Sequence, residues 1–313
     1  MTDLASQDAQ TAVAFAKGRS LWDDAQLRLM RNPAAVISLF VVAVLAFLAL
    51  FGSDIVIGPL KIPGFWVHDV DTIFRDSVGI APTLTDHHWL GTDSEGRDMV
   101  ARLLFGLRIS LLVGLTATAV ALTIGVLWGA IAGFFGGAID QIMMRAVDVL
   151  YSIPFVFFVI LLMTAIQTTD PFQKIVLIFV AIGAVEWLTM SRIVRGQTIA
   201  LRQKEFVEAA RAAGATPIQI VLRHIVPNVL GPVVIFATLN IPVVILLESF
   251  LSFLGLGVQE PLTSLGRLIA VGAQQMEASP WLLVSPAVLM LITLLALNFL
   301  GDGLRDALDP KDR

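Results

Sequence analysis

The feature that most constrains this chain is a long stretch without any charge. No Asp, Glu, Lys or Arg occurs between Arg108 and Asp140. A helix that crosses the hydrocarbon core of a bilayer needs about 20 mostly apolar residues. Charged residues make up only 15% of the chain, against roughly 25% in soluble domains, so there is too little polar surface to cover a soluble core. The chain is predicted to be an integral membrane protein.

Further apolar stretches predict an all-α membrane protein with six transmembrane helices. The expected spans are Ala34–Gly52, one within Ile109–Phe135, one between Asp148 and Asp170, one from Lys174 to about Met190, Val229–Leu256 and Pro280–Leu300. They divide the chain into an N-terminal segment at 1–33 with an interfacial helix over Gly18–Met30 and Trp22 at headgroup level, a first anchor at 34–52, an outer loop at 53–108, a five-helix core at 109–301 and a tail at 302–313.

The basic residues predict the orientation. With the N-terminus in the cytoplasm, 14 of the 21 Lys and Arg residues lie inside and seven outside, as the positive-inside rule expects. Both termini are then cytoplasmic. The net charge of −4 does not indicate a nucleic-acid partner. The absence of Cys excludes disulfides, thiolate metal sites and a cysteine nucleophile.

The loop between the fourth and fifth spans, residues 191–228, carries its own predicted structure. Glu205–Ala213 is rich in strong helix formers, and Gly214 follows where a C-terminal cap favours a positive φ. Thr216 and Pro217 form an N-cap and first-turn pair for a second helix, Ile218–Val226, which is expected to end before Pro227. The predicted product is a helix, a Gly turn and a second helix on the cytoplasmic face.

These residues carry a resemblance to a known family. Glu208-Ala209-Ala210, Gly214 and His224-Ile225-Val226-Pro227 resemble, in type and spacing, the EAA loop of ABC-importer permeases in the form of the peptide and nickel branch. Three other segments are similar to the same branch over nearly the whole chain from Gly18, in detail to the C-type permeases of bacterial oligopeptide importers: Gly91-Thr92-Asp93 with Gly96-Arg97-Asp98, Asp140–Pro154, and Glu248–Gly257 with the C-terminal tail.

The resemblance implies a type I ABC importer permease (MetI-like) fold in the bacterial inner membrane. It further implies a second homologous permease, two cytoplasmic ABC ATPases and a periplasmic peptide-binding protein as partners. The first loop helix would be the coupling helix that sits in a cleft of an ATPase, with Glu208 facing the ATPase or capping the helix and Gly214 setting the turn. The implied cargo is oligopeptides; dipeptides, nickel chelates and antimicrobial or murein peptides are the alternatives within the branch.

The chain itself is not expected to hydrolyse ATP. A phosphate-binding P-loop places Gly directly before its Lys, whereas the five lysines here follow Ala16, Leu60, Gln173, Gln203 and Pro310. We therefore expect no cofactor on this chain, with ATP and Mg²⁺ used by the partner ATPases.

Two carboxylates lie within predicted spans, where a charge usually faces a cavity or a partner. Glu186 and Glu248 are candidates for the translocation path or the permease interface; a neutral carboxyl hydrogen-bonded between helices, or a position near a span end, is the alternative. His87 and His88 beside Asp86 supply no obvious fourth ligand, so no metal is expected. The glycines of the second span predict close helix packing, including with a partner permease: Gly114, Gly125, Gly129 and Gly133.

Three other classes of protein fit less well. A membrane enzyme is disfavoured because the sequence has no His-Glu-x-x-His motif and no obvious carboxylate pair. A proton-coupled transporter could use Glu186 and Glu248 but has no need of an Ala-rich docking loop. A DNA-binding helix-turn-helix is disfavoured because the basic residues flank the second loop helix.

Overall fold

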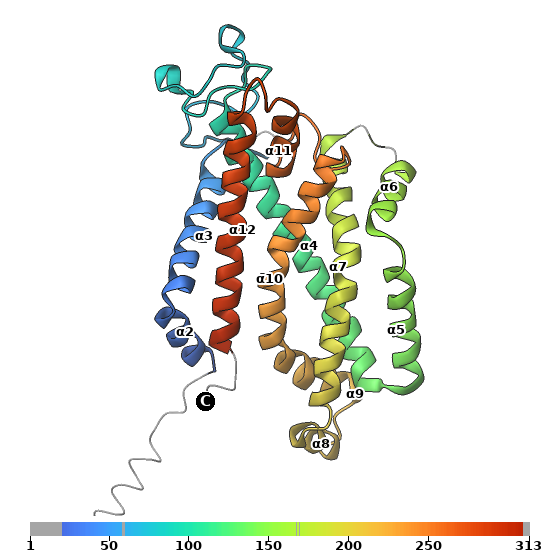
Figure 1. Cartoon of the computed structure of the whole chain (residues 1–313). Coiled ribbons are helices and arrows are strands. Elements are labelled where there is room, and N and C mark those ends of the chain that lie inside the picture. The colour runs from blue at the N-terminus through green and yellow to red at the C-terminus, as the bar shows by residue number, and fades with distance from the viewer. Residues whose placement is uncertain (1–20, 58–59, 167, 169, 309–313) are drawn as a thin grey trace, which may run out of the picture.

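Helices make up most of the computed structural model, which describes residues 21–308 except 58, 59, 167 and 169 (Figure 1). A short antiparallel hairpin places Ile55 opposite Ile62. Residues 1–20 of the predicted N-terminal segment, residues 309–313 of the predicted tail and the side chain of Trp22 lie outside the described part. In chain order the elements are α2 (Leu21–Arg31), α3 (Pro33–Phe51), β1 (Ile55–Ile57), β2 (Leu60–Ile62), η1 (Arg75–Ser77), η2 (Thr85–His87), α4 (Met99–Phe135), α5 (Gly137–Tyr151), α6 (Phe155–Ala165), α7 (Pro171–Leu201), α8 (Glu205–Ala212), α9 (Pro217–Ile220), η3 (Val221–Ile225), α10 (Val226–Phe253), α11 (Leu265–Gln274) and α12 (Trp281–Leu308).

The helices confirm the all-α membrane fold. Among the described residues, five helical stretches are long and apolar enough to cross a bilayer, and a sixth crossing exists if α5 and α6 are counted as one bent span. The five correspond to the predicted first, second, fourth, fifth and sixth spans. The helix expected over Gly18–Met30 is present as α2, which ends at Arg31 and packs near α12, with Leu29 close to Gly303.

The third span is broken rather than continuous, which corrects the prediction of one helix there. α6 has only 11 residues, or about 16 Å of helix, whereas a hydrocarbon core is about 30 Å thick. α5 meets α6 at an angle of 82°. Pro154 explains the break, because proline lacks an N–H and disfavours helical backbone at the residue before it.

The second span begins earlier than predicted. α4 starts at Met99, ten residues before Ile109, and Asp98 caps it by accepting a hydrogen bond from the Ala101 N–H at 2.9 Å. Arg108 is thereby inside the helix. Its buried guanidinium donates four hydrogen bonds of 2.6–3.2 Å to carbonyl oxygens at the C-terminal end of α3, which a helix by itself leaves unpaired, and just after it: Ala49, Leu50, Ser53 and Asp54.

The fourth span runs farther than predicted, so the loop expected from Ser191 begins only after Leu201. Val194 and Thr198 on this extension are fully buried, because they pack against the glycines of α4. A Cβ added at Gly129 would lie 2.4 Å from the Ser191 carbonyl oxygen, and one at Gly133 would lie 2.8 Å from that of Arg195. Because Gly129 and Gly133 have no side chains, the backbones of α4 and α7 approach each other closely at these positions.

The glycines of α4 therefore pack within the chain. Gly125, Gly129 and Gly133 face α7, while Gly114 faces Ile241 and Ile245 of α10. The sequence also allowed these glycines to pack against a partner permease. That part of the prediction is wrong for this conformation, because α7 and α10 already occupy the space beside each glycine.

The helix expected to end before Pro227 instead continues into the fifth span. α9 leads into one π-helical turn, η3, and then into α10 without a loop. The Val226 N–H reaches back five residues to the Val221 carbonyl, and this wider turn precedes Pro227, which has no N–H to donate. The Gly turn is thus followed by one continuous element, Pro217–Phe253.

The bundle has two distinct ends (Figure 1). The connection between α3 and α4, residues 53–98, lies at one end beside α11. At the opposite end lie α8, α9, α2 and the C-terminal end of α12. Residues far apart in the sequence are therefore brought together at each end.

Candidate functional sites at the two ends of the bundle

The helix at one end, α8, has the form that the sequence predicts. It spans Glu205–Ala212, and Gly214 follows with φ +81°. The Thr216 side chain accepts from the Gln219 N–H while the Gln219 side chain accepts from the Thr216 N–H, a reciprocal capping box that starts α9. Pro227 is exposed in the first turn of α10. Local sequence thus sets the turn between α8 and α9.

One side of α8 is held against the bundle and the other is open. Val207 is fully buried in an apolar cluster formed by the ends of α4 and α7 and by η3. The Arg211 guanidinium lies over the Phe134 ring at 5.5 Å. Glu208 and Ala209 are exposed, and Ala210 is half-buried. The Lys204 side chain at the N-cap of α8 makes no capping hydrogen bond, and Glu208 lies exposed in the first turn.

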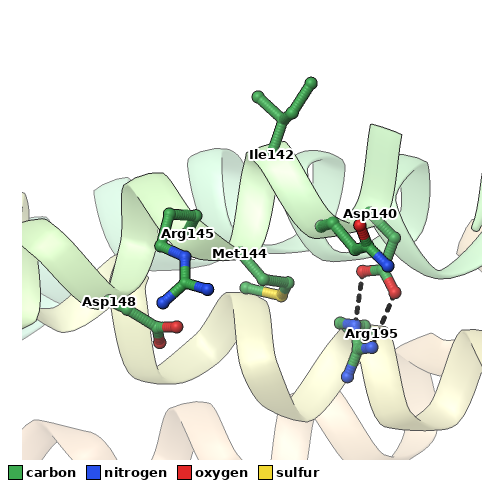
Figure 2. A pocket seen from close by; sticks show the side chains of 7 residues that line it. Asp140, Ile142, Met144, Arg145, Asp148 and Arg195 are labelled. Carbon is green, nitrogen blue, oxygen red and sulfur yellow. Dashed lines mark hydrogen bonds and ion pairs between the residues drawn. The ribbon is translucent and has the colours of Figure 1, made fainter. Parts of the chain in front are cut away.

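A polar cavity of about 540 Å³ lies between α5 and α7 (Figure 2). Asp140 and Arg195 form a two-bonded ion pair across it, with N–O distances of 2.5 and 2.6 Å. Arg192 pairs with Asp148 at 2.9 Å and lies over the Tyr151 ring. These pairs hold α5 to α7 just before the break at Pro154. Sequence analysis missed this cavity, because the arginines had been assigned to a loop.

The two carboxylates within spans are far from equivalent. Glu248 is fully buried, and its Oε1 accepts from the Ser252 and Ser264 hydroxyls at 2.7 Å each. Its Oε2 has no hydrogen-bond partner. Glu186 is half-buried and interacts with the Asn240 side chain of α10. Glu248 is closed off from solvent in this conformation, whereas Glu186 retains access.

At the other end, the motif at residues 91–98 forms a compact hydrogen-bonded turn. Gly91 and Gly96 have φ values of +75° and +82°, the left-handed region that glycine adopts readily. The Thr92 hydroxyl donates to the Ser77 carbonyl and accepts from the Ile80 N–H. Asp98 accepts from the Trp66 indole N–H at 2.9 Å in addition to capping α4. The motif therefore ties segment 53–98 to the start of α4.

The same motif supplies one half of an ion cluster. Asp93 Oδ2 accepts from Arg97 Nε at 2.9 Å and from Arg102 Nη1 at 2.5 Å. Glu260, which precedes α11, pairs with both arginines: Oε2 lies 2.5 Å from Arg97 Nη1 and Oε1 lies 3.0 Å from Arg102 Nη2. Asp93, Arg97 and Arg102 are buried. Sequence analysis did not connect Glu260 to the motif, since 163 residues separate it from Arg97.

Two opposing effects act on the acids of this cluster. Burial by itself raises the pKa of Asp93, but the hydrogen bond from the Arg97 N–H and the charges of Arg102 and Arg97 outweigh it and lower the pKa below its ordinary value. Burial likewise raises the pKa of Glu260, and its hydrogen bonds and charge interactions with Arg97 and Arg102 outweigh it in the same way. Both acids are therefore ionised at neutral pH.

His88, next to this motif, pairs with Asp98 rather than with Asp86, its neighbour in the sequence. His88 is buried with Nδ1 2.9 Å from Asp98 Oδ1, while Asp86 and His87 are exposed. The ligand atoms of His68, His88 and Asp98 lie within 4.8 Å of one another. The two imidazole rings, however, are stacked at 4.7 Å, so their in-plane lone pairs do not converge. His88 and Asp98 act here as a hydrogen-bonded anchor at the start of α4, and the expectation of no metal stays a prediction.

Known proteins match this chain along nearly its whole length. Residues 125–313 match the family described as the binding-protein-dependent transport system inner membrane component, and residues 20–75 match the N-terminal TM domain of oligopeptide transport permease C. The oligopeptide transport system permease protein OppC of Haemophilus influenzae is 52% identical over 95% of this chain and 91% of its own. OppC of Escherichia coli K12 is 51% identical over 99% of both chains.

A dipeptide transport system permease protein, DppC of Bacillus subtilis, is 40% identical over 94% of this chain and 87% of its own. Among solved structures, a chain of the inward-facing MetNI methionine ABC transporter shares the fold, with a TM-score of 0.51 and 23% identity over 67% of this chain and 97% of that one. The chain therefore belongs to the inner-membrane components of binding-protein-dependent ABC importers, as a non-catalytic permease of the oligopeptide branch.

Proposed function

We propose that this permease forms one half of a peptide path and is driven through α8. The observation that carries the proposal is the construction of α8: one buried residue, Val207, fixes it to the ends of α4 and α7, and an open face with Glu208 and Ala209 points away. A rigid helix attached in this way can pass the closure of a docked ATPase to the spans. ATP and Mg²⁺ are bound by the two ATPase partners.

Cysteine cross-linking tests this docking, because the chain has no Cys of its own. In the assembled transporter, Ala209→Cys is expected to cross-link to an ATPase subunit carrying a single engineered Cys in its docking cleft. Val207→Cys, two residues away on the buried side, is the matched control and should not react. An Ala209→Cys variant that labels with a small thiol reagent yet forms no cross-link, with or without ATP, contradicts the proposal.

The proposed orientation has both termini and α8 in the cytoplasm. The charge balance supports it, and so does the location of α2, α8 and the C-terminal end of α12 at one end of the bundle (Figure 1). Thiol labelling of single Cys substitutions at Ala212 and at Leu84 in spheroplasts tests it. We expect the impermeant reagent to reach position 84 only; labelling of position 212 in intact spheroplasts contradicts it.

We propose that the peptide path runs along the α5–α6 break and Glu186, against a second homologous permease. Residues 151–154 at the break are exposed in the single chain. Non-helical backbone at membrane depth has to be covered by protein or line a water-filled cavity. Glu186→Gln is expected to slow peptide uptake while the transporter still assembles. If Glu186→Gln and Glu248→Gln both take up peptide at the wild-type rate, neither carboxylate acts in the path.

The binding protein is proposed to dock on segment 53–98 together with residues 259–280. The Gln275 side chain donates to the Ser94 hydroxyl at 3.0 Å, so the two segments form one surface. Leu84 is 84% exposed and Val67 is 69% exposed on it. Leu84→Asp is expected to weaken docking of the binding protein, measured by surface plasmon resonance. Unchanged affinity in a variant with Leu84→Asp and Val67→Asp together contradicts the proposal.

The proposed cargo is oligopeptides rather than dipeptides, because residues 20–75 match the N-terminal TM domain of oligopeptide transport permease C and the OppC proteins of Haemophilus influenzae and Escherichia coli K12 are 52% and 51% identical, against 40% for DppC of Bacillus subtilis. Growth of a deletion strain complemented with the transporter, on single peptides of two to six residues as the amino-acid source, tests this. Growth restored by dipeptides alone contradicts it.

A further inference from the structure

The loop between α10 and α11, residues 254–264, is anchored through two carboxylates: Glu260 within the loop pairs with Arg97 and Arg102, and Glu248 of α10 accepts from Ser264 at the end of the loop. Gly255 turns the chain with φ +79°. The Val258 N–H donates to the Ser252 hydroxyl at 3.3 Å, and the loop folds back so closely that a Cβ on Gly257 would meet Ser252. This loop is therefore a rigid connection rather than a slack one.

Its outer anchor is Glu260. Both carboxylate oxygens of Glu260 are engaged by Arg97 and Arg102, which Asp93 holds in place from the other side. Ion pairs of this two-bonded kind fix direction as well as distance. A displacement of the turn at residues 91–98 is therefore passed to the α10–α11 loop.

Its inner anchor is Glu248 on α10. The carboxylate accepts from Ser264, the residue that begins α11, and from Ser252. The Leu265 N–H donates to the Ser110 hydroxyl of α4 at 3.1 Å. Because Glu248 is fully buried with Oε2 unpartnered, loss of a hydroxyl here has no replacement from water. The loop thus moves with α10 near residue 248.

α10 connects this anchor to the opposite end of the bundle. The helical element runs without a loop from Phe253 back through η3 to Pro217, and Gly214 joins it to α8. Contacts carry coupling between distant sites where a contiguous, rigid set of elements links them. Segment 53–98, the α10–α11 loop, α10 and α8 form such a set (Figure 1).

We propose that the α10–α11 loop, anchored by Glu260 and Glu248, transmits docking of the loaded binding protein on segment 53–98 to α10 and so to α8. Glu260 and Glu248 are positioning residues in this scheme and need no contact with the peptide. The inference rests on the proposed docking of a binding protein and an ATPase at opposite ends.

The test uses the assembled transporter in lipid nanodiscs, titrated with its binding protein loaded with tri-alanine. Two quantities are measured: the concentration of binding protein that gives half-maximal stimulation of ATP hydrolysis, and the maximal stimulation itself. For Glu260→Gln we expect maximal stimulation to fall by about fivefold or more, at the lower bound of measured allosteric couplings, with the half-maximal concentration changed by less than about twofold.

Glu95→Gln is the matched control. Glu95 Oε2 lies 3.2 Å from Arg97 Nη2, so it also pairs with Arg97, but both residues belong to segment 53–98. Removing this acid leaves the connection to the loop intact, and maximal stimulation at saturating binding protein should equal that of wild type. If the effect of Glu260→Gln came only from removing a negative charge beside Arg97, Glu95→Gln would lower the maximal stimulation to the same extent.

Glu248→Leu, which removes the oxygen that accepts from both serine hydroxyls, should show the same separation of docking from stimulation. In the variant that carries both substitutions, maximal stimulation should be no lower than in the more impaired of the two single variants, because both changes detach the same loop. Additive losses would overturn the proposal, as would wild-type stimulation in Glu260→Gln or a loss of docking in that variant. If Glu260→Gln does not assemble, Arg97→Lys, which keeps the charge but not the two-bonded geometry, decides by the same criteria. A wild-type complex that does not respond to the binding protein contradicts the proposed docking instead.

Discussion

The close contact of α4 with α7 gives the sharpest prediction for the fold. At Gly129 an added Cβ would lie 2.4 Å from the Ser191 carbonyl oxygen and 2.9 Å from both the Arg195 nitrogen and the Val194 Cβ. Two of these three atoms belong to the backbone, so no side-chain rotation relieves the overlap. Ordinary contacts begin at 3.4 Å, and the helices would have to separate locally by about 1 Å.

The expected cost of Gly129→Ala follows from this geometry. Overpacking of a well-packed core costs roughly 1–3 kcal/mol, and the unrelievable backbone contact places this site toward the upper part of that range. At about 2.1 cal/mol/K of unfolding entropy per residue, one kcal/mol shifts the melting temperature of a 313-residue chain by roughly 1.5 °C. We therefore expect Gly129→Ala to melt roughly 3–5 °C below wild type, measured by tryptophan fluorescence on purified protein in detergent.

Gly196→Ala is the matched control for this change. Gly196 lies on α7 near the same contact, but nothing lies within 4 Å of the position its Cβ would take. Because Ala is favoured over Gly within a helix by roughly 0.5–1 kcal/mol, this variant should melt at or slightly above the wild-type temperature. Equal melting temperatures for Gly129→Ala, Gly196→Ala and wild type would refute the close backbone contact.

Three further predictions concern the ends of the bundle. The pKa values of Asp93 and Glu260 lie below their ordinary values, so the ionised acids stabilise the attachment of segment 53–98 at any pH above those ordinary pKa values, and this contribution is lost as the pH falls through the lowered pKa values. The amides of residues 91–98 should therefore stay protected from hydrogen exchange from pH 7 to 5 and lose protection below about pH 4. Protection that fell already at pH 6 would contradict the assignment. Gly214→Ala places a Cβ at φ +81°, a cost of roughly 1–2 kcal/mol; we expect weaker co-purification of the ATPases with little change in the melting of the bundle, and unaltered co-purification would argue against a fixed turn. Arg108→Lys removes the planar set of donors that caps α3; at roughly 1.5–3 kcal/mol for hydrogen bonds to a charged group, we expect faster proteolysis near residues 50–54, and an unchanged cleavage rate would show that a single ammonium suffices.

Local sequence determined the elements whose signals lie within a few residues of each other. The α8–Gly214–α9 unit was predictable because caps, turns and helix propensity act over one or two helical turns. The positions of five spans were predictable for a related reason: the bilayer demands a run of apolar residues of fixed length, and such a run is visible in the sequence alone. Family membership followed from motifs of the same short range.

Sequence patterns misplaced the elements whose limits depend on distant partners. The start of α4 was placed too late because a charged residue such as Arg108 indicates the edge of a span until its carbonyl partners on α3 are known. The end of α7 was placed too early because Arg192 and Arg195 read as loop residues until their partners on α5 are seen. In each case a charge was counted as exposed when a partner compensates its burial.

The sequence by itself decided that lipid surrounds this chain, where five of its spans lie and which loop helix lies at one end, because hydrophobic length and helix capping are local properties. Only the tertiary structure decided what the charged residues of the two ends do. Glu260 meets Arg97 across 163 residues, and Glu248 meets Ser264 across a closed loop. A buried charge is stable only beside its partners, and the fold determines which partners those are.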